Sequence, residues 1–249
     1  MTEGERQASI RDVWRAVVPH AWRERLRELR HRRRRRVRLG DLRRTTPIEL
    51  HLGRTRGGPI DRHYIEAFLD AHRGDIRGRV LEVLDPGYTE RFGSGVEHVD
   101  ILDIDPTNRR ATITADVTDL APVADETFDC ILLTQVLQLV WDVQSAMNAL
   151  ARVLAPGGVL LATLPGIVRN APGKCDWWRF TSWSARRLAE DAFGAGAVEV
   201  ETYGNVLAVT GFLYGLGRDD FDAKTLAVND PRFEFVVAIR AVKQPHQDR

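Results

Sequence analysis

The sequence predicts an α/β fold in which an arginine-rich helical extension precedes a doubly wound, mostly parallel sheet. The first observation is that, after residue 78, apolar strand-like runs alternate with helices or short crossovers. Strands that are apolar throughout are typical of parallel sheets covered by helices on both faces. The second observation is charge: residues 1–60 contain 17 Arg against 7 Asp and Glu, whereas the rest of the chain contains 19 basic and 28 acidic residues. We therefore expect a leader over 1–45 and a folded domain over 46–249.

The leader is expected to be helical and basic. Residues 9–36 have an apolar stripe of near-helical period that includes Trp14 and Trp22, a kink at Pro19, and a run of arginines at 32–36. Three interpretations stay open: a solvated leader that docks on the acidic body, a weak contact with an anionic membrane or another polyanion, and self-association into a homo-oligomer. We expect no nucleic-acid partner.

The remaining elements follow in order. Pro59 suits the first position of a helix, and Gly74 and Gly78 end that region. Seven strands are expected, at 80–84, 99–104, 111–115, 128–134, 159–164, 198–203 and 233–242. Further helices are expected at 145–154, stopped by Pro156-Gly157-Gly158, and at 183–193, capped by Thr181 or Ser182. The insert 204–231 joins the last two strands in place of a crossover helix.

Composition excludes several classes of protein. With 43% apolar and 29% charged residues, the chain has the composition of a globular protein and not of a fibrous or wholly disordered one. No apolar run approaches the ~18 residues of a membrane span, and the acidic start lacks the basic region of a signal peptide. We therefore expect a cytoplasmic location. Cys130 and Cys175 lack metal-ligand spacing, and we expect no metal site.

Acidic residues follow several predicted strands. In an open α/β sheet, ligands bind outside the carboxyl ends of the strands. Asp103 ends the second strand and lies 21 residues after Glu82, close to the ~20-residue offset at which nucleoside-binding folds place a carboxylate. A carboxylate can accept hydrogen bonds from both ribose hydroxyl groups. Asp103 is therefore the expected ribose ligand, with Asp105 as the alternative.

Residues 80–164 resemble a class I S-adenosylmethionine-dependent methyltransferase of the type-11 kind. Downstream, the run from Asp176 to Thr181 resembles an Asp-aromatic-Trp-Arg-Phe-Thr element of one subgroup. The resemblance implies a Rossmann-like methyltransferase sheet and S-adenosylmethionine as the cofactor. The segments that carry it are Val80-Leu81-Glu82-Val83, Ile101-Leu102-Asp103-Ile104-Asp105-Pro106, Thr114-Ala115-Asp116-Val117, Phe128-Asp129-Cys130-Ile131-Leu132, Val136-Leu137-Gln138-Leu139-Val140 and Arg152-Val153-Leu154-Ala155-Pro156-Gly157-Gly158.

Two features depart from the family pattern. The glycine-rich first loop, Glu-x-Gly-x-Gly-x-Gly, is here Glu82-Val83-Leu84-Asp85-Pro86-Gly87-Tyr88, which keeps one glycine. We therefore expect the backbone to take another path under the methionine part of the cofactor. The Glu-His pair that often follows the fourth strand is replaced by Gln138-Leu139.

The resemblance also implies roles for single residues. Asp103, with Ile104 beside it, would bind the ribose, and Gln135 would line the cofactor near the sulfonium. Asp116, with Val117 beside it, would accept from the adenine amino group, unless it is only a turn residue. The residues expected to flank the methionine are Glu82, Asp85, Gly87 and Tyr88, unless Glu82 only satisfies N–H groups of the loop. Tyr64 and Arg62 would either contact the methionine from above or serve packing and a surface ion pair.

The expected reaction is methyl transfer to a hydroxyl group of a sugar or secondary metabolite. Such an in-line displacement depends mainly on positioning. A base, where needed, would be Asp176 or Asp142, or His51 or His63 from the leading segment, although the commoner role of a residue like Asp176 is an ion pair or a helix cap. The acceptor would meet Trp177, Trp178 and Arg179, unless the tryptophans pack in the core. The alternative is a non-catalytic scaffold that places the basic helix on a membrane or polyanion.

Overall fold

The computed structural model describes residues 19, 20, 22, 24, 25, 39–170, 173 and 175–245. The chain divides into two units, 1–45 and 46–249. In the first unit, the described part includes the short 3-10 helix η1 (Gly40–Arg43). Most of the predicted helix over 9–36, with its arginine run, lies outside the described residues. Among those that are described, no helix is long and apolar enough to cross a membrane.

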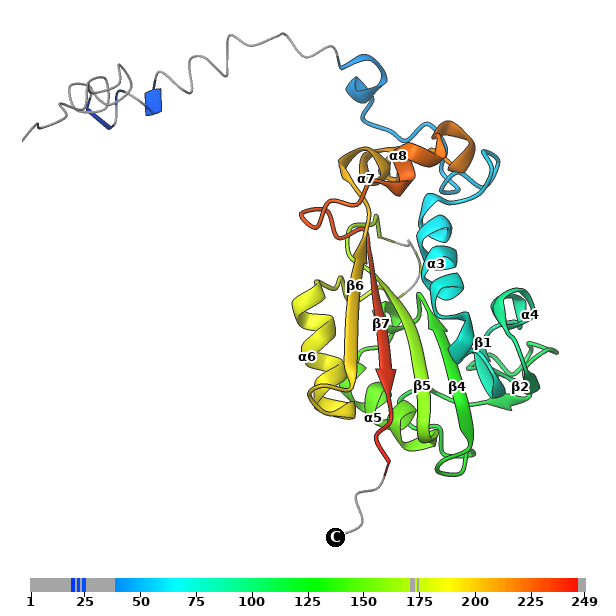
Figure 1. Cartoon of the computed structure of the whole chain (residues 1–249). Helices are drawn as coiled ribbons and strands as arrows, with labels where there is room; N and C mark the ends of the chain where they lie inside the picture. The colour runs from blue at the N-terminus through cyan, green and yellow to red at the C-terminus, as the bar shows by residue number, and fades with distance from the viewer. Residues whose placement is uncertain are drawn as a thin grey trace, which may run out of the picture. The chain divides into compact units, whose positions relative to one another are not determined.

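The second unit is built on a seven-stranded sheet in the order β3-β2-β1-β4-β5-β7-β6. All neighbouring strands are parallel except that β7 is antiparallel to both β5 and β6. The carboxyl ends of β1 to β6 therefore lie at one edge of the sheet, at the top in Figure 1. The prediction of a mostly parallel, seven-stranded sheet is confirmed. The strands are β1 (Gly78–Val83), β2 (Val96–Asp103), β3 (Ile113–Thr114), β4 (Phe128–Thr134), β5 (Leu154–Pro165), β6 (Val198–Tyr203) and β7 (Val236–Val242).

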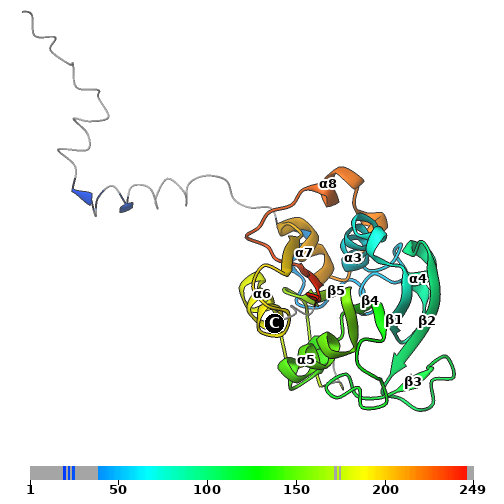
Figure 2. The ribbon, with the colours of Figure 1, turned by 60° about the horizontal axis from the view of Figure 1, so that its bottom comes forward.

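Helices cover both faces of the sheet, as the continuous apolar strands predict. On one face, α5 and α6 bury Leu150 and Phe193 against the strands. On the other face, α3 and α7 bury Phe68 and Phe212. Figure 2 shows α5 and α3 on opposite sides of the sheet. The helices are α3 (Ile60–Ala71), α4 (Gly87–Phe92), α5 (Val143–Val153), α6 (Ser182–Phe193), α7 (Val206–Leu213) and α8 (Ala223–Ala227).

Helix α5 ends at Val153, one residue earlier than predicted, and β5 begins at once at Leu154. The three residues Pro156-Gly157-Gly158 are therefore the first part of a strand and not a separate helix stop. Between the two candidate caps of α6, Thr181 is the one found, because its hydroxyl accepts from the Ser184 N–H.

Two helices were not predicted in the insert 204–231, namely α7 and α8. The side chain of Asn205 caps α7 by accepting from the N–H groups of Leu207 and Ala208, both at 3.0 Å. The last strand starts at Val236 and not at Phe233. Helices α7 and α8 lie near the carboxyl edge of the sheet (Figure 1), and Phe212 of α7 lines the cavity at this edge.

Candidate active site at the carboxyl edge of the sheet

A cavity of about 910 Å³ opens at the carboxyl edge of the parallel strands. Its walls come from the segments after β1 to β5 and from the segment that leads into α3. Eight of the predicted site residues line it: Asp103, Ile104, Asp116, Val117, Gln135, Asp176, Trp177 and Arg179. Eight others lie outside its lining: His51, His63, Tyr64, Glu82, Asp85, Gly87, Tyr88 and Trp178.

Asp103 is held in one orientation at the end of β2, where it is 7% exposed. Its Oδ1 accepts from the Asp105 N–H at 2.9 Å, and its Oδ2 accepts from Nδ2 of Asn108 at 2.7 Å. The same Nδ2 donates to the carbonyl oxygen of Leu84 at 2.9 Å. Asn108 therefore ties the carboxylate at the end of β2 to the loop after β1. No local pattern in the sequence marks Asn108 for this role.

Of the two carboxylate oxygens of Asp116, one is hydrogen-bonded within its own turn and the other can accept from a ligand. Its Oδ1 accepts from both the N–H and the hydroxyl of Thr118, each at 2.8 Å, which makes it a turn residue. Among the described residues, its Oδ2 has no hydrogen-bond partner. The side chain is exposed and lines the cavity, so this oxygen can accept a hydrogen bond from a ligand.

Glu82 supports the first loop from below and does not line the cavity. Its carboxylate accepts from the N–H groups of Tyr88 at 3.0 Å and Thr89 at 2.8 Å, at the start of α4. Burial raises the pKa of Glu82, and the hydrogen bonds from α4 oppose this rise. Asp85 likewise accepts from the Gly87 N–H at 3.0 Å. Glu82 is therefore an acid that satisfies backbone N–H groups next to the first loop.

Around the cavity, three residues other than glycine have a left-handed backbone conformation. The φ angles are 60° at Leu52, 74° at Leu84 and 55° at Gln135. Leu84 occupies the position of the first glycine in the family pattern. The backbone there has a glycine-like conformation although the residue is leucine. A side chain in this region costs ~1–2 kcal/mol. Such strain is typical of functional sites, where the surrounding structure holds it in place.

Tyr64 belongs to the core and not to the cavity wall. It is 3% exposed, and its ring centroid lies 6.1 Å from that of Tyr203 and 5.9 Å from that of Phe235. Its hydroxyl is buried without a partner among the described residues. Arg62 does line the cavity, and its Nη1 donates to the hydroxyl of Tyr88 at 3.1 Å, which joins α3 to α4.

The predicted bases are not free in the cavity. Asp176 forms a bidentate ion pair with Arg179, with Nη1–Oδ1 and Nη2–Oδ2 distances of 2.6 and 2.7 Å. Hydrogen bonding to Asp176 raises the pKa of the Arg179 guanidinium, although partial burial opposes this. His51 is exposed and His63 is half-buried against Tyr64. Within the described parts of the chain, no histidine lines the cavity.

The aromatic residues divide between cavity and core. Trp177 lines the cavity, whereas Trp178 packs against the core and donates from Nε1 to the carbonyl oxygen of Val140 at 2.9 Å. Trp183 is 83% exposed and lies outside the cavity lining. Trp141 also lines the cavity, with its ring centroid 5.0 Å from that of Trp177. The sequence did not indicate Trp141, because its partners lie far along the chain.

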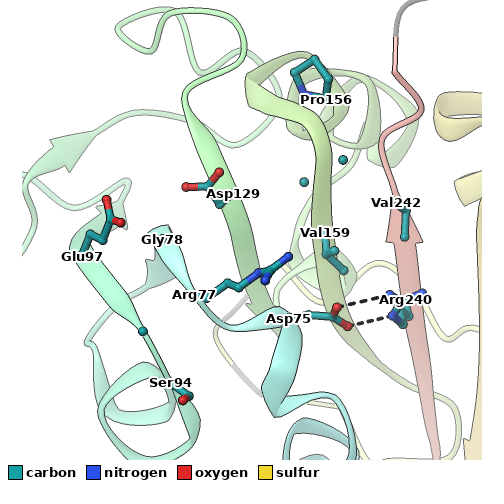
Figure 3. A pocket seen from close by; sticks show the side chains of 13 residues that line it. Asp75, Arg77, Gly78, Ser94, Glu97, Asp129, Pro156, Val159, Arg240 and Val242 are labelled. Atoms are coloured by element: carbon teal, nitrogen blue, oxygen red, sulfur yellow. Dashed lines mark hydrogen bonds and ion pairs between the residues drawn. The ribbon is translucent and has the colours of Figure 1, made fainter.

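A second cavity, of about 790 Å³, lies at the opposite edge of the sheet (Figure 3). It is lined by the Asp75–Arg240 ion pair, with an Nε–Oδ2 distance of 2.8 Å, and by Asp129, which accepts from the Arg79 N–H. None of the predicted site residues lines it. Within the described ranges, no group of three or more His, Cys, Asp and Glu residues could hold a metal ion. The carboxyl-edge cavity is therefore the candidate site.

Comparisons with known proteins show which proteins this chain is similar to. Residues 87–162 match the family model of a methyltransferase domain. None of the curated proteins matches the chain. Among solved structures, the chain is similar to one from a complex that contains the Haloferax volcanii Trm112 methyltransferase activator, at 17% identity over 76% of this chain and 92% of that one, with a TM-score of 0.52. It is also similar to a SAM dependent methyltransferase from Archaeoglobus fulgidus, at 11% identity over 73% and 94% of the two chains, with a TM-score of 0.50. At these identities the similarity shows a shared fold.

Proposed function

Because the chain carries a class I S-adenosylmethionine-dependent methyltransferase domain, we propose that it methylates a hydroxyl group of a small molecule in the carboxyl-edge cavity. The observation that carries this proposal is the position of Asp103 and Asp116. They follow neighbouring strands and line the same cavity as the indoles of Trp141 and Trp177. Its volume of about 910 Å³ falls within the ~300–1,000 Å³ typical of ligand sites.

The acidic side chains suit the nucleoside part of the cofactor. An ionised carboxylate has about four acceptor positions, and Asp103 uses two of them, toward Asp105 and Asn108. The remaining positions would accept from the ribose hydroxyl groups without reorientation of the side chain. The free Oδ2 of Asp116 would accept from the adenine amino group, with Val117 beside it. Gln135 lines the same cavity at the end of β4, where it would lie near the sulfonium.

The chain contributes positioning more than proton transfer. When bound, S-adenosylmethionine would supply a methyl group on a sulfonium: the bond from methyl carbon to sulfur would break as the acceptor oxygen bonds to that carbon, S-adenosylhomocysteine would leave, and the hydroxyl proton would pass to water. The protein must hold that oxygen on the axis of attack, which supplies much of the acceleration. Asp176 is occupied by Arg179, and His51 and His63 lie outside the cavity lining. We therefore propose a reaction without a single strong base.

Calorimetric titration of the full chain with S-adenosylhomocysteine tests the proposed function. We expect one saturable site, and we expect Asp103→Ala to raise the Kd roughly 10- to 150-fold, because a charge-assisted hydrogen bond contributes about 1.5–3 kcal/mol. Asp105→Ala is the matched control, since Asp105 lies in the same loop but outside the cavity lining. Absence of saturable heat, or an equal effect of the two substitutions, would refute the assignment.

A further inference from the structure

Two exposed indoles form a corner in the wall of the cavity. Trp141 is 64% exposed and Trp177 is 51% exposed, and their rings meet at 71°. Trp178 supports the corner from behind, because its ring lies 5.6 Å from that of Trp141 and its Nε1 is bonded to Val140. The N–H of Trp177 donates to the carbonyl oxygen of Gln138 at 2.8 Å. The corner is thus fixed in place and offers apolar aromatic surface to a flat ring.

Two arginines in the same cavity lack an acidic partner. The side chain of Arg169 makes one hydrogen bond within the described residues, from Nη2 to the carbonyl oxygen of Leu50 at 2.6 Å. The guanidinium group of Arg54 has no hydrogen-bond or ion-pair partner among them. The bond to Leu50 places Arg169 beside the segment that carries Arg54. In contrast, the other arginines of the lining have an acidic neighbour: Arg179 is paired with Asp176, and Arg62, which also donates to the Tyr88 hydroxyl, interacts with the charge of Asp61.

The carboxylates of the lining do not compensate these two cations. Asp103 and Asp116 lie at the ends of β2 and β3, on the part of the cavity proposed for the nucleoside. Asp176 is neutralised by Arg179. Asp142 caps α5 by accepting from both the N–H and the hydroxyl of Ser145. Burial raises the pKa of the Asp61 carboxyl, against the effect of the neighbouring Arg62.

We propose that the methyl acceptor is a planar apolar ring compound that carries a carboxylate or another anionic group. This inference rests on the proposed function and specifies its substrate class. The ring lies in the corner of Trp141 and Trp177, and the anion pairs with Arg169 and Arg54. Guanidinium groups hold planar anions through charge-assisted hydrogen bonds, which are stronger than bonds between neutral groups. A cationic acceptor would instead meet two unpaired positive charges.

Calorimetry with two matched probes tests this class. Hydroxynaphthoate has the flat ring, the hydroxyl and the anion, and hydroxynaphthamide has the same ring and hydroxyl without the charge. Each is titrated into the full chain with and without saturating S-adenosylhomocysteine. We expect the acid to bind at least about tenfold more tightly than the amide, because the lost contact is charge-assisted. Equal affinity of the two probes for the unaltered chain would overturn the proposal.

Substitutions then assign the two parts of the site. Arg169→Met should remove most of the preference for the acid, and Trp177→Leu should weaken both probes by a similar factor. The controls are Arg187→Met and Trp183→Leu, since both side chains are exposed outside the cavity lining. A preference that survives both Arg169→Met and Arg54→Met would also overturn the proposal. Loss of S-adenosylhomocysteine binding would refute the proposed function instead, and the titration without it still measures the preference for the acid.

Discussion

The hydroxyl group of Tyr64 is buried between α3 and β7 without a hydrogen-bond partner among the described residues. Tyr64→Phe removes that hydroxyl and keeps the ring contacts with Tyr203 and Phe235. Leaving a polar group buried and unpaired costs about 1–3 kcal/mol. We therefore expect the substitution to raise the free energy of unfolding by at least about 1 kcal/mol.

The same group makes stability depend on alkaline pH. Burial raises the pKa of Tyr64 from 10.0 to about 12. Because the pKa is higher in the folded state, the contribution of Tyr64 to stability is fully present below pH 10 and is lost as the pH rises toward about 12. One pKa unit corresponds to about 1.4 kcal/mol, so this loss is of the order of 2–3 kcal/mol. The Tyr64→Phe variant should lose less stability than the unaltered chain over this window.

Urea unfolding followed by tryptophan fluorescence at several pH values measures both effects. Tyr203→Phe is the matched control. At neutral pH it should lower the free energy of unfolding, because the hydroxyl of Tyr203 donates to Glu201 Oε2 at 2.6 Å. A parallel titration with S-adenosylhomocysteine separates packing from cofactor contact. If Tyr64→Phe destabilises the chain, or raises the Kd tenfold, the hydroxyl has a partner and the assignment of Tyr64 to the core is wrong.

Three further substitutions test the cavity wall. Asn108→Ala removes the hydrogen bonds to Asp103 and to the Leu84 carbonyl. Calorimetry should show S-adenosylhomocysteine binding weakened about fivefold, since a hydrogen bond contributes about 1 kcal/mol. Unchanged affinity would mean that Asp103 needs no support from Asn108. Leu84→Gly relieves the strain of the left-handed backbone and should raise the free energy of unfolding by about 0.5–1 kcal/mol after the entropy cost of glycine. A lower free energy of unfolding, measured by urea unfolding, would argue against strain at this residue. Asp176→Asn breaks the ion pair with Arg179 and should destabilise the chain by about 1–3 kcal/mol without changing cofactor affinity. A loss of cofactor binding would show that Asp176 contacts the cofactor.

The strands could be predicted well because burial on both faces leaves a clear pattern. The predicted bounds of β4 and β6 agree with the structure to the residue. Helix α7 was missed because its eight residues, Val206–Leu213, are almost all apolar and show no polar face. Helix α4 was missed because it follows Pro86 and begins at Gly87, two residues that usually indicate a turn.

The site could be predicted only where its residues follow strands. Strand topology brings Asp103 and Asp116 to one edge, so their positions in the sequence were sufficient to predict that they line the same cavity. The roles of Trp141 and Asn108 depend on contacts made only in the folded chain, with Trp177 and with Leu84. Trp177 and Trp178 are adjacent in the sequence, yet one lines the cavity and the other packs against the core. Composition could not separate them, because the backbone decides which ring is turned inward.

The chain contains two cysteines, and their surroundings make them chemically unequal. Cys130 lies in β4 with no exposed surface, and burial raises the pKa of its thiol, so it has little reactive thiolate. Cys175 is exposed and lines the carboxyl-edge cavity. A maleimide dye added to the unaltered chain will therefore label the cavity wall and leave the sheet untouched. Fluorescent reporters of cavity occupancy can be made without first removing or introducing a cysteine.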